Sequence, residues 1–331
     1  MLYVNNDNIL DPAVNLGIEE YILRKLDPNE TYLMFYSMEP SVIVGKNQNT
    51  MEEINTAFVR ENAVNVVRRL SGGGAVYNDE GDLSFSFITK DDGNSFHNYE
   101  KFTEPVIRAL NQLGVNAKLS GRNDIEVDGK KVSGNAQFST KGRIFSHGTL
   151  LFDVNLDHVQ EALTPNPEKI ESKGVKSVRS RVTNIREHLD KDMDIHEFRR
   201  TLLKFIFEVD DVKEVPEYKL TDEDWHEIHE IIATRYKNWD WNFSKSPKFN
   251  VKHTERFPAG TIDVRLHVNK GVIEDATLFG DFFGVGDVKD IETRLTGTRY
   301  EAAELEKALS DLEIGHYLGN ITKEEFLNVL L

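Results

Sequence analysis

Apolar and polar residues alternate along several short stretches of the chain, a pattern typical of β-strands with one buried face. Leu83, Phe85 and Phe87, for example, are separated by Ser84 and Ser86. Other short runs are rich in apolar and β-branched residues and end at turn-forming residues. The pattern therefore predicts strands over residues 31–36, 41–44, 64–69, 82–87 and 143–154.

A hairpin is predicted where Ile125-Glu126-Val127 and the run from Val132 flank Asp128-Gly129, because an Asp-Gly pair favours a tight turn between two strands. Helical spacing occurs elsewhere. Apolar residues recur at intervals of three and four up to Leu113 and stop before Gly114, a typical helix end. Thr50 and Glu53 have the spacing of a capping box and predict a helix through residue 62.

The pattern changes in the last third of the chain. Residues 157–245 are mainly helical in pattern and include a capped helix start at Thr221, and residues 244–248 then have the composition of a linker. A second hairpin is predicted over residues 261–283 around Asn269-Lys270-Gly271, and helical patterns follow to the end. We therefore expect two domains, over residues 1–245 and 246–331.

The 331-residue chain contains no cysteine, which excludes a disulfide framework, a cysteine-ligated zinc site and a thiolate nucleophile. No apolar run approaches the roughly 20 residues that a membrane-spanning helix requires. The N-terminus lacks the basic and apolar regions of a secretory signal. We therefore expect a cytoplasmic protein that has no membrane partner.

Lys and Arg total 40 against 56 Asp and Glu, which gives a formal net charge of −16. Binding to nucleic acid requires a basic surface, so we expect no nucleic-acid partner. The charge is uneven, since residues 60–186 carry 18 basic and 16 acidic side chains, whereas residues 187–331 carry 19 and 31. An anionic ligand is expected in the middle segment, and chance clustering is the alternative.

A glycine triplet follows the strand predicted over residues 64–69, in the run Arg68-Arg69-Leu70-Ser71-Gly72-Gly73-Gly74-Ala75-Val76-Tyr77. Consecutive glycines let backbone N–H groups approach a ligand closely, and the two arginines supply fixed positive charge for a phosphate or carboxylate. The spacing matches neither the P-loop nor the dinucleotide fingerprint. A plain tight turn is therefore an equal interpretation.

Further candidates for anion chemistry lie downstream of the triplet. Lys131 lies on the predicted hairpin, where it could reach an anion, and Asp124 could carry a metal ion that bridges phosphates. His147 precedes Gly148, and residues 173–186 contain five basic side chains and no acid. Each feature also has a structural interpretation: an exposed hairpin, a core histidine and a solvated loop.

Taken in order, these segments resemble the lipoate–protein ligase family. The matching runs are Arg-Arg-x-Ser-Gly-Gly-Gly-Ala-Val, Gly-Arg-Asn-Asp-Ile, Gly-Lys-Lys-Val-Ser-Gly-x-Ala and His-Gly-Thr-Leu-Leu. Residues 174–184 and the run Trp239-Asp240-Trp241-Asn242-Phe243 extend the similarity over essentially the whole chain. Each motif is weak alone, but their common order is specific. One departure is Asn78, where some relatives carry histidine.

The resemblance implies an α+β fold, in which a mixed β-sheet flanked by helices is similar to class II synthetases and biotin ligases. A small α+β C-terminal accessory domain follows it. The implied reaction uses ATP and Mg²⁺ to convert lipoate to lipoyl-AMP and pyrophosphate. The lipoyl group then passes to a lysine on a lipoyl domain of a 2-oxoacid dehydrogenase complex or on the glycine-cleavage H protein. Octanoate should also be accepted, because an apolar pocket discriminates weakly between chains of similar size.

The resemblance also implies roles for individual residues. Lys131 matches the lysine that contacts both the lipoate carboxylate and the nucleotide, and Asp124 lies where Mg²⁺ is expected. Segment 173–184 is expected to cover the site. The residues matched to ATP binding are Arg69, Gly74, Ala75, Val76, Tyr77 and Asn123, and those matched to lipoate binding are Ser71, Gly72, Gly73 and His147.

Other functions compete with this interpretation. An acyltransferase of the same superfamily is excluded because its thioester requires a cysteine. A biotin ligase is disfavoured by the Arg-Arg-x-Ser-Gly-Gly-Gly run and by the C-terminal domain. The intact Lys131 and the complete glycine segment argue against a catalytically silent binding module, and an assay of pyrophosphate release separates that module from an enzyme.

Overall fold

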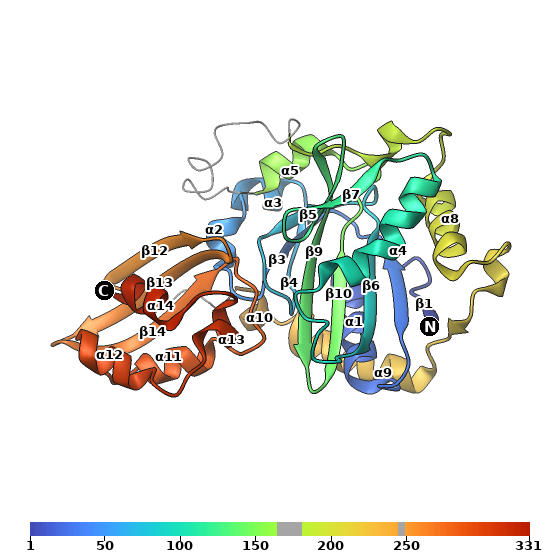
Figure 1. Cartoon of the computed structure of the whole chain (residues 1–331). Coiled ribbons are helices and arrows are strands. Elements are labelled where there is room, and N and C mark those ends of the chain that lie inside the picture. The colour runs from blue at the N-terminus through green and yellow to red at the C-terminus, as the bar shows by residue number, and fades with distance from the viewer. Residues whose placement is uncertain (164–180, 244–248) are drawn as a thin grey trace. The chain divides into compact units, whose positions relative to one another are not determined.

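A computed structural model describes residues 1–163, 181–243 and 249–331 (Figure 1). Residues 164–180 and 244–248 lie outside the described residues; they contain most of the expected covering segment and the expected linker. The chain forms two compact units, which are described separately. The first unit comprises Met1–Ile43, Met51–Arg68 and Val76–Asn242, and the second comprises Val44–Thr50, Arg69–Ala75 and Phe243–Leu331.

The first unit is built on a large mixed sheet, which has eight strands within the described residues in the order β11-β1-β2-β6-β10-β9-β8-β7. β1 is parallel to β2 and β11, and the other neighbours are antiparallel. The strands are β1 (Leu2–Asn5), β2 (Tyr32–Tyr36), β6 (Ser84–Lys90), β7 (Ala117–Ser120), β8 (Asp124–Val127), β9 (Lys130–Thr140), β10 (Arg143–Gly148) and β11 (Glu217–Tyr218).

Helices cover both faces of this sheet (Figure 1). Large apolar side chains such as Phe85 and Ile125 form a core with α4 and α8, whereas α1 packs between the opposite face and α9 with the π-helical turn η3. The mixed sheet flanked by helices confirms the expected α+β class. The helices of this unit are α1 (Pro12–Lys25), α4 (Tyr99–Gln112), α5 (Leu156–Ala162), η1 (Ile185–His188), α8 (Ile195–Phe207), η2 (Val212–Glu214), α9 (Asp222–Ile231), η3 (Ile232–Tyr236) and α10 (Trp239–Phe243).

A smaller sheet has the order β4-β3-β5, from β3 (Ser41–Val44), β4 (Asn65–Arg68) and β5 (Val76–Asn78). The single helix predicted from residue 50 to residue 62 is wrong, because two short helices, α2 (Thr50–Glu53) and α3 (Thr56–Glu61), replace it. Asn55 interrupts them: its backbone is extended, and its side chain accepts a hydrogen bond from the Phe58 N–H as a new helix cap.

The Asp128-Gly129 hairpin is confirmed, and both turn residues have positive φ, 51° and 78°, as a tight two-residue hairpin turn requires. The capped start at Thr221 is also confirmed, since Thr221 and Asp224 form a reciprocal capping box. The strand predicted over residues 143–154 is too long. β10 ends at Gly148, and beyond it Leu151 forms an isolated bridge with Asp82.

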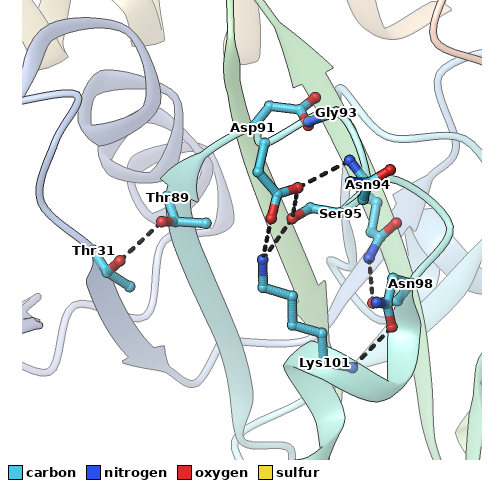
Figure 2. Close-up of polar contacts among 10 residues, drawn as sticks. Thr31, Thr89, Asp91, Gly93, Asn94, Ser95, Asn98 and Lys101 are labelled. Atoms are coloured by element: carbon cyan, nitrogen blue, oxygen red, sulfur yellow. Dashed lines mark hydrogen bonds and ion pairs between the residues drawn. The ribbon is translucent and has the colours of Figure 1, made fainter.

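The loop that leads from β6 into α4 is fixed by polar side chains (Figure 2). The Lys101 ammonium lies 2.9 Å from Asp92 Oδ2 and donates to Ser95 Oγ at 2.7 Å. Asn98 caps α4 by accepting from the Lys101 N–H at 3.2 Å. Beside this loop, the hydroxyls of Thr31 on the β2 side and Thr89 on β6 are 2.8 Å apart.

The second unit contains the antiparallel sheet β12-β13-β14 and helices that share an apolar core with it. The predicted turn at Asn269-Lys270-Gly271 is confirmed between β13 and β14, and the strand before them was not predicted. The elements are β12 (Val251–Phe257), β13 (Gly260–Asn269), β14 (Val272–Gly280), α11 (Lys289–Leu295), α12 (Ala302–Ala308), α13 (Ile314–Leu318) and α14 (Lys323–Leu330).

No helix of the described residues is both long enough and apolar enough to span a membrane.

Candidate active site

Lys131 and Asp124 form an ion pair on the neighbouring strands β9 and β8. The Lys131 Nζ lies 2.8 Å from Asp124 Oδ1, and each side chain keeps 36% of its surface exposed. The pair is therefore accessible to a ligand. Its ammonium is held at a defined place, and it can still exchange the carboxylate for another anion.

A β-bulge directs Lys131 to this position. Ile125 is paired with Ser133, but Glu126 is paired with Lys131, so Val132 is an extra residue in β9. Side chains alternate between the two faces of a strand, so Lys131 and Gly134 would lie on opposite faces of a regular strand. The bulge places them on the same face, together with Asp124, the cross-strand partner of Gly134.

Gly134 leaves room for the Lys131 side chain. A Cβ atom at this position would lie 2.8 Å from Lys131 Nζ and 3.1 Å from its Cε. A Cβ so close to these atoms would force the end of the Lys131 side chain to move, so any other residue at this position would displace the ammonium. The bulge and the glycine thus act together to place one charge.

Asn123 and Asn135 tie the turn before β8 to β9. The Asn123 amide donates to the Asn135 carbonyl at 2.6 Å, and the Asn135 amide returns a bond to the Asn123 carbonyl at 3.0 Å. Asn123 therefore fixes the strand that presents Asp124. Asn135 was not selected from the sequence, although it directly follows Gly134 in a motif that was.

His147 lies on β10 and faces α1. Its Nδ1 lies 2.9 Å and 3.2 Å from the two carboxylate oxygens of Glu19, and both side chains are buried. Sequence reasoning missed Glu19. The available signal was the presence of three polar residues, Asn15, Glu19 and Glu20, among the apolar residues that precede the basic last turn of α1; all three are buried.

Small residues lie beside His147 on the neighbouring strands, whereas on β10 itself the Phe145 ring lies 4.7 Å from the His147 ring on the same face. His147 is paired with Ser86 on β6 and with Ala136 on β9, and Gly134 lies two residues before Ala136 on the same face. The opposite face carries large side chains such as Phe85. Lys131, Asp124 and His147 therefore share one face of the sheet.

The end of the basic segment is attached beside Lys131. Val182 forms a parallel bridge with Lys131, and the Thr183 N–H donates to the Lys131 carbonyl at 3.1 Å. Of the segment expected to cover the site, residues 173–180 lie outside the described residues, and Arg181 is exposed. The described part thus begins next to the candidate lysine.

Residues Arg69–Ala75 belong to the second unit, and their arrangement there has a structural cause. The Arg69 guanidinium donates to the Ser71 hydroxyl at 3.0 Å and to the carbonyls of Gly72 and Gly74 at 2.6 Å and 2.9 Å. A Cβ at Gly72 would lie 2.4 Å from the Phe282 carbonyl oxygen. Arg69 thus organises the loop, and the absence of a Cβ at Gly72 is required by packing.

Val76 and Tyr77 lie on β5 in the first unit. The Tyr77 hydroxyl lies 3.2 Å from His158 Nδ1, and burial raises the pKa of Tyr77 to about 12. Next to it, Asn78 donates to Asp82 Oδ2 at 2.9 Å. Asp82 is fully buried, and this burial raises the pKa of its carboxyl well above the ordinary value. The neutral side-chain amide of Asn78 therefore donates a hydrogen bond to the buried Asp82 carboxyl.

Comparisons with known proteins agree with the geometry. The family model of the lipoyl protein ligase A/B catalytic domain matches residues 11–207, and that of the bacterial lipoate protein ligase C-terminus matches residues 246–330. The chain therefore belongs to the lipoate–protein ligase family and is a ligase. It is 62% identical to lipoate-protein ligase LplJ of Bacillus subtilis over 100% of both chains.

Solved structures show the same similarity. LipL1 of P. falciparum in complex with lipoate matches with a TM-score of 0.77 and 25% identity, covering 99% of this chain and 96% of that one. A lipoate-protein ligase A bound with ATP matches with a TM-score of 0.60 and 27% identity, covering 73% of this chain and 96% of that one. The resemblance found in the sequence is thus confirmed at the level of family and fold.

Proposed function

We propose that this enzyme activates lipoate with ATP and transfers the lipoyl group to a lysine of an acceptor protein. In the first step a lipoate carboxylate oxygen bonds to the α-phosphorus, and the bond to the leaving pyrophosphate breaks. In the second step the acceptor amine attacks the acyl carbonyl, an amide forms, AMP leaves and the amine loses its proton. The observation that carries the proposal is the partly exposed Lys131 ammonium paired with Asp124 at 2.8 Å.

The chemistry explains why a cation is needed. Lipoate is ionised at neutral pH, so the first step needs no general base, but it must bring together two anions that repel each other. Lys131 would lie between the carboxylate and the α-phosphate, reduce their repulsion and stabilise the charge that develops during transfer. The same ammonium would polarise the acyl carbonyl for the second step.

The other site residues keep the roles expected from the resemblance. We assign nucleotide contacts to Arg69, Asn123 and the run from Gly74 through Ala75 and Val76 to Tyr77. Lipoate contacts are assigned to Ser71, Gly72, Gly73 and His147. The Arg69 bonds that order the glycine loop support this assignment, because ordered backbone N–H groups bind an anion without a further loss of entropy.

Asp124 is proposed to hold Mg²⁺. Among the described residues, no group of three or more His, Asp or Glu side chains could hold a metal ion by itself. Mg²⁺ commonly binds one or two carboxylates, together with substrate phosphates and water, so a single partly exposed carboxylate beside the proposed phosphate site fits it. The ion would supply positive charge to the phosphates.

The lipoyl chain is proposed to lie along the sheet face that carries Gly134, Ala136 and Ser86, between that face and α1. The absence of a large side chain at these three positions supports the proposal. Burying about six methylenes contributes up to ~5 kcal/mol of binding. We expect octanoate to bind as well, because a pocket of this kind distinguishes poorly between chains of similar length.

We propose a catalytic domain over residues 1–245 and an accessory domain over residues 246–331. The acceptors would be lipoyl domains of 2-oxoacid dehydrogenase complexes or the glycine-cleavage H protein, and the enzyme would act in the cytoplasm. The matches of the two family models on either side of residue 246 support the division.

The direct test incubates the enzyme with Mg-ATP, lipoate and a panel of unmodified acceptor domains, and follows intact mass. We expect one lipoyl mass increment on an acceptor lysine, with release of pyrophosphate that requires lipoate. Binding of lipoate and ATP without release of pyrophosphate would instead identify a silent binding module and contradict the proposal.

A further inference from the structure

Arg68 and Asn242 are the residues at which the chain leaves the first unit, since the second unit continues with Arg69 and with Phe243. The two residues are 174 positions apart in the sequence, but they are hydrogen bonded to each other. The Asn242 side-chain oxygen accepts from the Arg68 N–H at 2.8 Å, and the Trp241 indole N–H donates to the Arg68 carbonyl at 2.8 Å. Side chains of α10 thus bind both the N–H and the carbonyl of Arg68, the last residue of β4.

The Arg68 side chain returns these bonds. Its Nε donates to the Trp241 carbonyl at 2.8 Å, and its Nη2 donates to the Asn242 carbonyl at 3.2 Å. The guanidinium is therefore placed at the C-terminal carbonyls of α10, where positive charge is favourable. Arg68 is among the largest fully buried side chains, and burial lowers its pKa to about 10, which still leaves it charged at neutral pH.

α10 also contacts η3, the π-helical turn that precedes it. The Asn242 amide donates to the Tyr236 carbonyl at 2.8 Å, and the Arg235 guanidinium stacks 4.6 Å from the centre of the Trp241 ring. Arg235 also pairs at 3.0 Å with Glu20 of α1, whose side chain is buried. Both Tyr236 and Arg235 belong to η3. π-Helical turns are rare in proteins, and those that occur are often found at functional sites.

Trp241 and Asn242 of the Trp-x-Trp-Asn-Phe run belong to this network, and the proposed ligase chemistry assigns them no role. We propose that Arg68, Trp241 and Asn242, here called the clasp, are positioning residues that fix the start of segment Arg69–Ala75 in the conformation that binds nucleotide. The proposal rests on the proposed function, because it assumes that this segment contacts ATP. A segment fixed at its first residue loses less entropy when a ligand binds to it.

The test uses Trp241→Phe, which keeps an aromatic ring beside Arg235 but removes the indole donor, and Asn242→Ala, which removes more hydrogen bonds. The matched control is Trp239→Phe in the same helix, where the indole is 66% exposed. Amide hydrogen exchange of residues 69–75 and the KM for ATP are measured in the full-length chain at a temperature well below unfolding.

For both clasp variants we expect faster exchange in residues 69–75 and a rise of about tenfold in the KM for ATP, because a displaced contact loses much of its effect. The control should match the wild type in both measurements. A lowered melting temperature with unchanged exchange and KM would show a purely structural role, and so would failure of Trp241→Phe to fold; either overturns the proposal. If the wild type itself releases no pyrophosphate, the proposed function is wrong, whereas the exchange result still reports on the clasp.

Discussion

At the scale of single residues, the position of the Lys131 ammonium depends on two features that carry no charge. The extra residue Val132 turns the lysine to the face of Gly134, and Gly134 leaves the space that the lysine then occupies. The sequence indicated Lys131 through a family motif, but a bulge changes only the pairing register and leaves no clear mark in composition. Glu19 was missed for a related reason, because its partner His147 is 128 positions away.

Gly134→Ala should leave the fold intact, since the backbone at Gly134 does not have positive φ, but it should displace the ammonium. We expect a loss of about tenfold or more in the rate of adenylate formation. The measurement is pyrophosphate release, with circular dichroism as a check on folding. Gly315→Ala is the control, because its Cβ would meet only the Ile321 carbonyl oxygen, at 3.6 Å. Equal activity of the two variants would show that the space at Gly134 is irrelevant.

Glu19→Gln removes the charge that holds His147. Hydrogen bonds to charged groups contribute roughly 1.5–3 kcal/mol, so we expect the KM for lipoate to rise about tenfold or more, with little change in the KM for ATP. Steady-state kinetics with each substrate varied provides the measurement. Combining Glu19→Gln with His147→Gln should add little further effect, because the two residues act as a pair. Fully additive losses would mean that Glu19 acts independently of His147.

At the scale of elements, the sequence correctly predicted turns and helix caps whose conformation is determined by residues close to them in the chain. The Asp128-Gly129 turn and the cap at Thr221 were correct, because both are decided within a few positions. Errors arose where a second local signal was overlooked. Asn55, for example, caps a new helix in the middle of the single helix that was predicted. Strand β12 was missed because its partner β13 decides its pairing. The clasp between β4 and α10 could not be inferred from local pattern.

Asp224 connects α9 to α1 and illustrates how such contacts depend on pH. It accepts bonds from the Tyr21 and Tyr218 hydroxyls and from the Thr221 N–H. Burial opposes ionisation, but these bonds prevail and hold the pKa of the Asp224 carboxyl below its ordinary value. The contribution to stability is therefore fully present above the ordinary pKa of the unfolded carboxyl and is lost as the pH falls from that value through the lower pKa of the folded one.

We expect Asp224→Asn to lower the free energy of unfolding by about 1–3 kcal/mol at pH 7. The difference from the wild type should shrink below about pH 4, where the unfolded carboxyl becomes protonated. Chemical denaturation at several pH values provides the measurement. Asp222→Asn, an exposed residue in the same helical turn, should change stability little. A difference that stays constant down to pH 2 would contradict the assignment.

At the scale of the whole molecule, the uneven charge matters most. The chain has a net charge of −16, yet residues 60–186 are slightly basic and contain Lys131 and the segment that ends beside it. An acidic acceptor protein would be repelled by most of the chain and attracted to this segment. The uneven charge and the family resemblance both indicated this region from sequence.

Replacing Arg179 and Arg181 with Glu should slow acceptor modification about tenfold, with adenylate formation within twofold of the wild type, since rim charges mainly affect association. Both half-reactions are measured separately, by pyrophosphate release without acceptor and by transfer from supplied lipoyl-AMP. The effect on transfer should weaken as salt is added. Equal slowing of both half-reactions would refute this division of roles.

The central claim is that one ammonium holds two anionic reactants together, and pyrophosphate release by purified Lys131→Ala tests it most directly. With saturating Mg-ATP and lipoate, the account predicts a folded protein whose rate of lipoate-dependent release is lower by about 10²–10³. A folded Lys131→Ala enzyme that releases pyrophosphate at nearly the wild-type rate would contradict it.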